Sequence, residues 1–331
     1  MTLLRIKDLC VHYITVDGVA KVLNEVNLDV NEGESIALVG ESGCGKTTVL
    51  RTILGILPEN ARIVKGKIIF KGVNILSLSR EEFYKLKGSE FAYIPQEPIT
   101  ALNLFYTIGD QFTDVLLLKG TTKINLLKYL KLKRELYPKL GPEVIKYLKI
   151  VKIPEPERVV KSYPFQLSGG MLQRVLIAMA IAKKPSLLLA DEPTTALDVI
   201  TQKEILDLLK SLKRELGISM MYVTHNLGVA KEVSDRIVVM YGGEVIEIAS
   251  TEELLEQPLH PYTKGLIGAI PKLTITELKP IEGGVIDYYN PPPGCRFYPR
   301  CPLATEICKL KRPSLIEVSK GHLIACHRIK G

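Results

Sequence analysis

Residues 40–47 read "GESGCGKT", and this short stretch constrains the fold more than any other part of the chain. It follows the pattern G-x-x-x-x-G-K-[ST], in which backbone N–H groups and a helix N-terminus surround a phosphate. Gly40, Gly43 and Gly45 permit the close backbone approach that polyphosphate needs, because they lack a Cβ atom. The apolar run "ESIALVG" predicts a buried strand before the loop, and the apolar spacing from Thr47 onward predicts a helix after it. The stretch therefore predicts a nucleotide-binding loop between a strand and a helix.

The side chains of this loop suggest how each would meet a nucleotide. Lys46 is expected to reach the β and γ phosphates, and the Thr47 hydroxyl is expected to bind Mg²⁺. The predicted binding residues are Gly40, Glu41, Ser42, Gly43, Cys44, Gly45, Lys46, Thr47 and Thr48. A glycine-rich turn with a chance Lys-Thr pair is the alternative, and the flanking strand and helix disfavour it.

A second stretch, "SLLLADEP", places two carboxylates at the end of a buried strand. Burying adjacent carboxylates costs several kcal/mol unless a metal or water uses them. We expect Asp191 to face Mg²⁺ through water and Glu192 to act as general base on the attacking water. The alternative is an exposed acidic pair that begins a turn before Pro193.

Strand and helix patterns alternate along the chain and predict a largely parallel sheet covered by helices. Residues 79–180 are mostly helical in pattern and form a predicted helical subdomain. Proline and glycine become frequent after about Thr251, so we divide the chain into a nucleotide-binding domain at 1–255 and a C-terminal extension at 256–331.

Composition limits the cellular setting and the partners. Hydrophobic residues make up 46% of the chain and charged residues 24%, as in folded globular proteins. No apolar run is long enough to span a bilayer, and the N-terminus lacks a signal-peptide pattern, so we expect a cytosolic protein. The net charge of +8 is concentrated in residues 119–149, which hold nine Lys or Arg and two Glu. A solvated helix face explains this, with anionic lipid or an acidic partner as the alternative, and nucleic acid is not expected.

The stretch "LSGGMLQRVLIAMAIA" begins at Leu167 and predicts a helix capped by Ser168, Gly169 and Gly170. The N-terminus of this helix would be a second anion-binding site. One chain has little use for two such sites around one ATP, but two chains packed head to tail would use both. The stretch resembles the ATP-binding-cassette signature, with Met171 where glutamine is commoner. The resemblance implies a P-loop NTPase cassette of α/β class with an antiparallel β subdomain, a helical subdomain and a small C-terminal extension.

Four further positions match motifs of this family. Tyr13 in "VHYITVDG" matches the aromatic residue that stacks on adenine, and Gln96 in "YIPQEP" matches the glutamine that senses Mg²⁺ and the membrane partner. Asp198 in "TTALD" matches the D-loop aspartate, and His225 in "YVTHN" matches the histidine that contacts the γ-phosphate. Asn226 departs from the family, which usually has aspartate there. The resemblance thus implies ATP and Mg²⁺ as cofactors, Glu192, His225 and Gln96 as catalytic residues, and Thr47, Gln96 and Asp191 near the metal.

Longer stretches are similar to the ATPase subunits of oligopeptide/dipeptide importers, the D-type in particular. They are "QEPITALNLFYTIGDQ", "YPFQLSGGMLQR", "ADEPTTALDV" and "HPYTKGL". This resemblance implies an ATPase at the cytoplasmic side of the cell membrane that powers import of peptides, or of oligosaccharides as in close relatives. The implied partners are a second cassette of the F-type, two transmembrane permease subunits and, indirectly, a solute-binding protein. ATP would join the two cassettes, and hydrolysis would let them part. The alternative is an ABC ATPase that is not coupled to transport.

Four of the six cysteines lie in the last forty residues: Cys295, Cys301, Cys308 and Cys326. Gaps of five, six and seventeen residues separate them and fit poorly with structural zinc sites, which usually begin with closer pairs. Both this spacing and the family resemblance favour a [4Fe–4S] cluster of structural role. Zinc, unligated thiols and a disulfide remain alternatives.

Overall fold

The computed structural model describes residues 1–119, 125–269 and 281–329 and separates the chain into two compact units. The first unit combines residues 1–76 with 221–331, and the second contains residues 77–220. The α/β class predicted from the sequence is confirmed.

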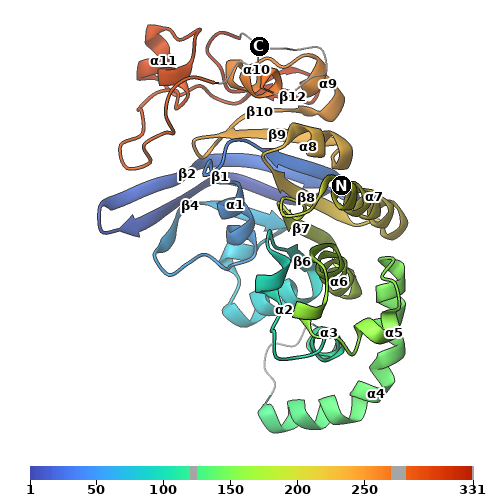
Figure 1. The fold of residues 1–331 in the computed structure, drawn as a ribbon. Coiled ribbons are helices and arrows are strands. Elements are labelled where there is room, and N and C mark those ends of the chain that lie inside the picture. Colours follow the sequence, from blue (N-terminus) through green and yellow to red (C-terminus); the bar gives the residue numbers. More distant parts are fainter. Residues whose placement is uncertain (120–124, 270–280, 330–331) are drawn as a thin grey trace. The chain divides into compact units, whose positions relative to one another are not determined.

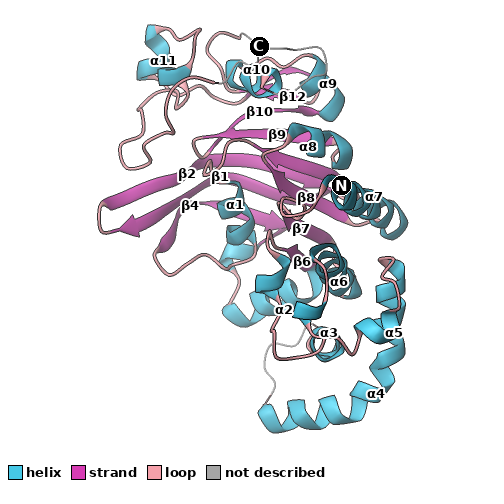
Figure 2. Cartoon of the chain, in the orientation of Figure 1, coloured by secondary structure: helices cyan, strands magenta, loops and turns pink. Residues whose placement is uncertain are grey.

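An antiparallel sheet of four strands in the order β2-β1-β4-β5 forms one part of the first unit. Its strands are β1 (Thr2–Thr15), β2 (Gly18–Asn31), β4 (Ala61–Phe70) and β5 (Val73–Asn74). Figure 2 shows β1, β2 and β4 as long neighbouring ribbons. Tyr13 of β1 pairs with Ala20 of β2 and with Ala61 of β4, which fixes its register in the middle of this sheet.

A second sheet in the same unit surrounds the strand that leads into the phosphate loop. The order is β11-β12-β10-β9-β3-β8, and β3 runs parallel to β9. Its strands are β3 (Ser35–Val39), β8 (Ser219–Thr224, which enters this unit at Met221), β9 (Arg236–Tyr241), β10 (Glu244–Ser250), β11 (Ile316–Ser319) and β12 (His322–Ile324). All five residues of β3 are buried, in agreement with the predicted apolar strand.

The C-terminal extension is built into this second sheet. β12 pairs antiparallel with β10, so the end of the chain adds two strands that the sequence pattern did not predict. Tyr241 of β9 and Tyr262 and Phe297 of the extension form edge-to-face contacts with ring centroids 4.8 to 5.4 Å apart. These rings join a buried apolar cluster that includes Ala37 and Val39 of β3. The extension therefore shares a hydrophobic core with the strand before the phosphate loop.

Short helices complete the first unit, and several lie around β10 and β12 (Figure 1). They are α1 (Lys46–Ile53), η1 (Ile75–Ser77, which ends in the second unit), α8 (Leu227–Val233), α9 (Thr251–Glu256), α10 (Pro261–Gly268), η4 (Tyr298–Arg300) and α11 (Glu306–Leu310).

The second unit is mostly helical and contains one pair of parallel strands, β6 and β7. Its elements are α2 (Arg80–Glu90), β6 (Phe91–Ile94), η2 (Pro98–Ala101), α3 (Ile108–Leu117), α4 (Leu126–Ile150), α5 (Pro156–Val159), η3 (Pro164–Gln166), α6 (Gly169–Ala182), β7 (Leu187–Asp191) and α7 (Val199–Leu216). Helix α6 is almost entirely buried from Leu172 onward, which explains its continuous apolar sequence.

The lysine-rich stretch lies mainly on α4, which contains Pro138 and Pro142 and bends in Figure 1. Each proline removes an intrahelical hydrogen bond, and this is a common cause of bending. Lys133 forms an ion pair with Asp114 of α3 at 2.8 Å, while most other basic side chains of α4 are exposed. The solvated-face interpretation agrees with this exposure. Lys123 of the same stretch lies outside the described residues. No helix in the described ranges has both the length and the apolar character needed to cross a bilayer.

Candidate nucleotide-binding site

The phosphate loop begins directly after β3 and ends at Gly45, the N-cap of α1. Gly43 and Gly45 have φ angles of 79° and 103°, which residues with a side chain rarely adopt. A Cβ at Gly45 would also lie 2.6 Å from Leu23, and one at Gly40 would lie 2.2 Å from the Met240 carbonyl oxygen. The three glycines expected from the pattern are therefore required by backbone conformation or by close packing.

Lys46 is buried, with 4% of its surface exposed, and its ammonium points back into the loop. Nζ donates to the carbonyl oxygens of Gly40 at 2.8 Å and Glu41 at 2.9 Å. Burial raises the pKa of the neighbouring Cys44 thiol, and the charge of Lys46 acts in the opposite direction. The loop thus presents one cation and a neutral thiol, a suitable environment for an anionic ligand.

Two other predicted residues of the first unit lie on strands. The Tyr13 hydroxyl is 3.3 Å from the Thr48 hydroxyl, which sets this aromatic ring beside the start of α1. His225 is exposed directly after β8. Asn226, the departure from the family pattern, caps α8 by accepting from the N–H groups of Gly228 and Val229. An aspartate could make the same cap, so the departure is locally neutral.

The second unit carries the predicted carboxylates. β7 ends at Asp191, which is 4% exposed and accepts from the Tyr93 hydroxyl at 3.3 Å. Glu192 has a φ of 45°, a left-handed conformation that is unfavourable for a residue with a side chain. Thr195 donates from its hydroxyl to Glu192 Oε2 at 3.0 Å. Glu192 therefore combines a left-handed backbone with a carboxylate that is oriented by a hydrogen bond.

The remaining predicted residues of this unit lie at helix ends and in a bend. Ser168 caps α6, as predicted, by accepting from the Met171 N–H at 3.4 Å. Asp198 caps α7 through bonds from Thr201 and Ile200, and these bonds lower the pKa of its carboxyl. Gln96 is exposed in a bend after β6. The structure thus gives Asp198 a capping role that the motif comparison did not indicate.

The predicted residues form two groups, one in each unit. The first unit holds Tyr13, residues 40–48 and His225, while the second holds Gln96, residues 168–170, Asp191, Glu192 and Asp198. Sequence reasoning missed three residues that contact the phosphate loop: Tyr262, Tyr288 and Arg300 of the C-terminal extension. Tyr262 lies within "HPYTKGL" and Arg300 lies within the cysteine-rich stretch between Cys295 and Cys301, but neither residue was assigned a role from the sequence.

The four C-terminal cysteines do not form the predicted metal site in this structure. Across the described ranges, no group of three or more His, Cys, Asp or Glu side chains is placed to hold a metal ion, and all six cysteines are free of disulfides. Burial raises the pKa of Cys295 to about 12, and the nearby Cys308 and Cys301 act in the same direction. Cys308 is buried and the other three are half-buried, and Cys295 and Cys301 pack against the apolar cluster that contains Tyr262 and Phe297.

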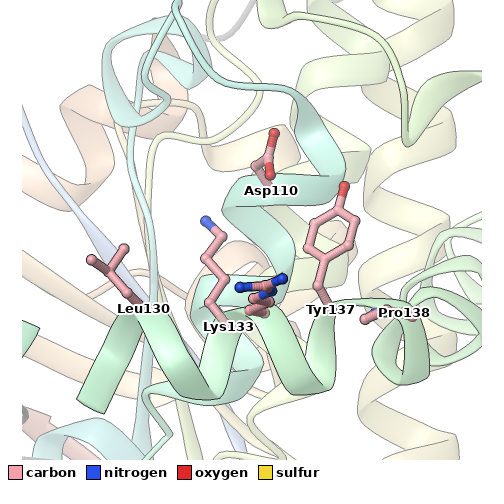
Figure 3. A pocket seen from close by; sticks show the side chains of 6 residues that line it. Asp110, Leu130, Lys133, Tyr137 and Pro138 are labelled. Carbon is pink, nitrogen blue, oxygen red and sulfur yellow. The ribbon is translucent and has the colours of Figure 1, made fainter. Parts of the chain in front are cut away.

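A hollow of about 390 Å³ lies in the second unit between α3 and α4. Figure 3 shows Lys133 and Tyr137 of α4 pointing toward Asp110 of α3, with Leu130 and Pro138 at either side. It contains none of the predicted nucleotide-binding residues.

Comparison with known proteins agrees with the motifs. Residues 23–195 match the ABC transporter family, and residues 246–308 match the C-terminal region of oligopeptide/dipeptide transporters. The chain is 40% identical to the dipeptide transport ATP-binding protein DppD of Bacillus subtilis over 326 residues, which cover 98% of this chain and 93% of the relative. It is also 40% identical to the oligopeptide transport ATP-binding protein OppD of Salmonella typhimurium over 329 residues, with 98% and 93% covered.

A solved structure shares the fold. It is the dimeric post-hydrolysis state of the ATP-binding cassette MJ0796 bound to ADP and Pi, with a TM-score of 0.61 and 29% identity. The match covers 75% of this chain and 98% of that one. Together with relatives that span nearly the whole chain, the family match shows that this chain is an ATP-hydrolysing member of the ABC transporter family.

Proposed function

We propose that this chain is the ATPase subunit of a peptide importer and works with two membrane permease subunits at the cytoplasmic face of the membrane. The observation that carries this proposal is the match of residues 246–308 to the C-terminal region of oligopeptide/dipeptide transporters. The relatives DppD and OppD are named for dipeptide and oligopeptide transport, which supports peptides as the solute class. Oligosaccharides are the alternative solute.

We propose for the predicted site residues the roles in nucleotide binding that their motifs imply. Tyr13 supplies a ring for adenine, residues 40–48 bind the phosphates, and Thr47, Asp191 and Gln96 face Mg²⁺. The donor types fit this metal, since magnesium prefers hydroxyl, carboxylate and amide oxygens. When bound, Mg²⁺ would neutralise charge on the phosphates.

Hydrolysis in this proposal depends on Glu192 as the general base that accepts a proton from the attacking water. The Thr195 hydrogen bond supports this role because it orients the carboxylate, and the left-handed backbone is a feature often found at functional sites. His225 is proposed to contact the γ-phosphate.

We also propose ATP-driven pairing with a second cassette, and the capped start of α6 supports it. Ser168, Gly169 and Gly170 offer a hydroxyl and N–H groups at the N-terminus of a long helix, which suits a phosphate of a nucleotide held mainly by another chain. The MJ0796 cassette is dimeric with ADP and Pi, which supports this arrangement. We propose an F-type paralogue as the second cassette.

A surface for the permease is proposed after Gln96. Three successive apolar side chains between η2 and α3 are exposed there: Leu104 at 43%, Phe105 at 88% and Tyr106 at 54%. Exposed apolar side chains that follow one another are unfavourable in water and are typical of protein contacts. Charge substitution at Phe105 should therefore uncouple transport from hydrolysis.

Replacing Glu192 with Gln tests the catalytic assignment. The variant should bind ATP but lose nearly all turnover, about a hundredfold or more, because general-base catalysis contributes on that order. Glu215→Gln changes an exposed glutamate at the end of α7 in the same way and should keep full activity. Undiminished turnover in Glu192→Gln would refute the base assignment.

Co-purification from membranes tests the transport assignment. The chain should be recovered with two permease subunits and a second cassette, and vesicles that contain the complex should take up peptide only with ATP. An ATPase recovered without any membrane protein would favour the alternative of an ABC ATPase that is not coupled to transport.

The iron–sulfur cluster stays a prediction without support from the structure. Purification without oxygen, followed by iron and sulfide analysis, decides it. A colourless protein that contains neither element would exclude the cluster, and zinc analysis of the same sample tests the other metal.

A further inference from the structure

Three side chains of the C-terminal extension contact the phosphate loop directly. Arg300 binds the Glu41 carboxylate, Tyr262 accepts from the Glu41 backbone N–H at 2.9 Å, and Tyr288 donates to the Gly43 carbonyl oxygen at 2.8 Å. All of these residues belong to the first unit. The loop is thus hydrogen-bonded to the extension at two of its own residues, Glu41 and Gly43.

Arg300 makes the most complete of these contacts. Its two terminal nitrogens donate to the two oxygens of Glu41 at 2.7 and 3.0 Å, a bidentate pair. The same guanidinium donates to the carbonyl oxygens of Ile281 and Glu282 at 3.1 and 2.9 Å. The Arg300 side chain is 8% exposed. Gly283 makes room for it, because a Cβ there would lie 2.9 Å from Arg300 Cγ.

The two tyrosines fix the backbone of the loop. Tyr262 is fully buried, and Tyr241 and Phe297 pack against its ring. Burial raises the pKa of Tyr262 and of Tyr288, so both hydroxyls stay protonated at neutral pH. Tyr288 also accepts from the Lys21 backbone N–H through its own carbonyl oxygen. Ring packing therefore holds the Tyr262 side chain, and a backbone hydrogen bond holds the segment that carries Tyr288.

A glycine-rich loop needs such support more than most segments. Gly40, Gly43 and Gly45 lose much conformational freedom when the loop is ordered around a phosphate. Contacts that order the loop in advance lower that entropic cost and strengthen binding. Lys46 adds to the effect, because its ammonium is bound to the carbonyl oxygens of Gly40 and Glu41, the residue that Arg300 and Tyr262 hold.

We propose that Arg300, Tyr288 and Tyr262 are positioning residues for ATP binding, so that the C-terminal extension sets the nucleotide affinity of the phosphate loop. This inference rests on the proposed role of residues 40–48. It does not depend on whether the cysteines hold a metal.

Two other arginines of the extension bind residues of the nucleotide-binding domain outside the phosphate loop, and they provide a control for Arg300. Arg312 pairs with Glu25 and with Glu244, at 2.8 Å for the latter, and does not touch the loop. Arg296 donates to the carbonyl oxygens of Gly242 and Lys21. Removing Arg312 should therefore weaken attachment of the extension without changing the loop contacts that Arg300 makes.

The experiment measures steady-state ATPase kinetics and equilibrium binding of a fluorescent ATP analogue in the full-length chain. Arg300→Met should raise KM and Kd about tenfold and leave kcat within about twofold, because a charge-assisted pair is removed from the loop. Arg312→Met should lower the melting temperature but leave Kd unchanged. Equal Kd values for these two variants would overturn the proposal.

A milder pair of variants keeps the test decisive if Arg300→Met does not fold. Tyr288→Phe removes only the hydroxyl that meets Gly43, and Tyr289→Phe removes the adjacent hydroxyl that bonds Thr15 at 3.0 Å. Tyr288→Phe should weaken ATP binding about threefold, and Tyr289→Phe should not change it. No difference between the two would refute the role of Tyr288.

Lys46→Ala separates failure of this inference from failure of the proposed site. If Lys46→Ala retains ATP binding, the assignment of the phosphate loop itself is wrong. If Lys46→Ala loses binding while Arg300→Met and Tyr288→Phe keep normal Kd values, the loop assignment holds and only the positioning role is refuted.

Discussion

His260 lies at the N-cap of α10 with 1% of its surface exposed, and its burial has a measurable consequence for stability. Its Nδ1 accepts from the Tyr262 backbone N–H at 3.0 Å, and the backbone N–H of His260 donates to the buried Glu247 carboxylate at 3.1 Å. Burial lowers the pKa of the imidazole from 6.5 to about 3. The ring is therefore neutral in the folded protein over the whole physiological range.

The difference between folded and unfolded pKa values sets the sign of the effect. Between pH 6.5 and about 3 the unfolded chain binds a proton at His260 and the folded chain does not. The free energy of unfolding therefore falls as the pH falls in this window, and the full contribution is present only above pH 6.5. From pH 7.5 to 5.0 the loss is about 2 kcal/mol, since each pH unit below the unfolded pKa costs about 1.36 kcal/mol.

His260→Asn isolates this contribution. Asn can accept from the Tyr262 N–H in place of Nδ1 and is a favourable N-cap, but it does not titrate. Urea unfolding followed by circular dichroism at pH 5.0, 6.0 and 7.5 should give the wild type a pH-dependent loss about 2 kcal/mol larger than that of the variant. The other ionisable groups are the same in both proteins, so their contributions to the pH dependence largely cancel. Parallel pH profiles for the two proteins would refute the reasoning, because they would mean that the folded chain accepts the proton.

Three further predictions concern the second unit. Gln173 of α6 is fully buried, and its amide has no hydrogen-bond partner among the described residues. Gln173→Met should therefore raise the free energy of unfolding, measured by urea titration, by about 1–2 kcal/mol. A loss of stability in this variant would contradict the prediction. Asp198→Ala should lower the same quantity by about 1 kcal/mol through loss of the α7 cap, and Asp198→Asn should restore most of it. Thr195→Val should lower kcat about tenfold at unchanged ATP Kd, because it removes one hydrogen bond that orients the Glu192 carboxylate; an altered Kd with normal kcat would argue against this role.

Local patterns predicted the elements around the loop because those elements are determined by near neighbours. The buried strand β3, the glycine loop and α1 follow each other within nineteen positions, from Ser35 to Ile53, and each has its own periodicity or backbone requirement. The cap at Ser168 was predictable for the same reason, since serine before two glycines and an apolar run is a helix start. By contrast, the left-handed backbone of Glu192 could not be predicted from the sequence, because such a backbone usually carries glycine and this position carries glutamate.

The C-terminal extension shows what kind of information local patterns lack. Arg300 and Glu41 are 259 positions apart, and neither residue type nor spacing indicates that they form a pair. The sequence pattern indicated the cysteines instead, because clustered thiols in a chain that is otherwise poor in cysteine suggest a metal site. Yet Cys295 and Cys301 bracket the turn that carries Arg300, and both pack against the apolar cluster that contains Tyr241 and Phe297. These two cysteines therefore have a packing role in the turn that contacts the phosphate loop, whether or not iron is bound. Variants that lack the thiols should be tested first for ATP affinity and then for metal content.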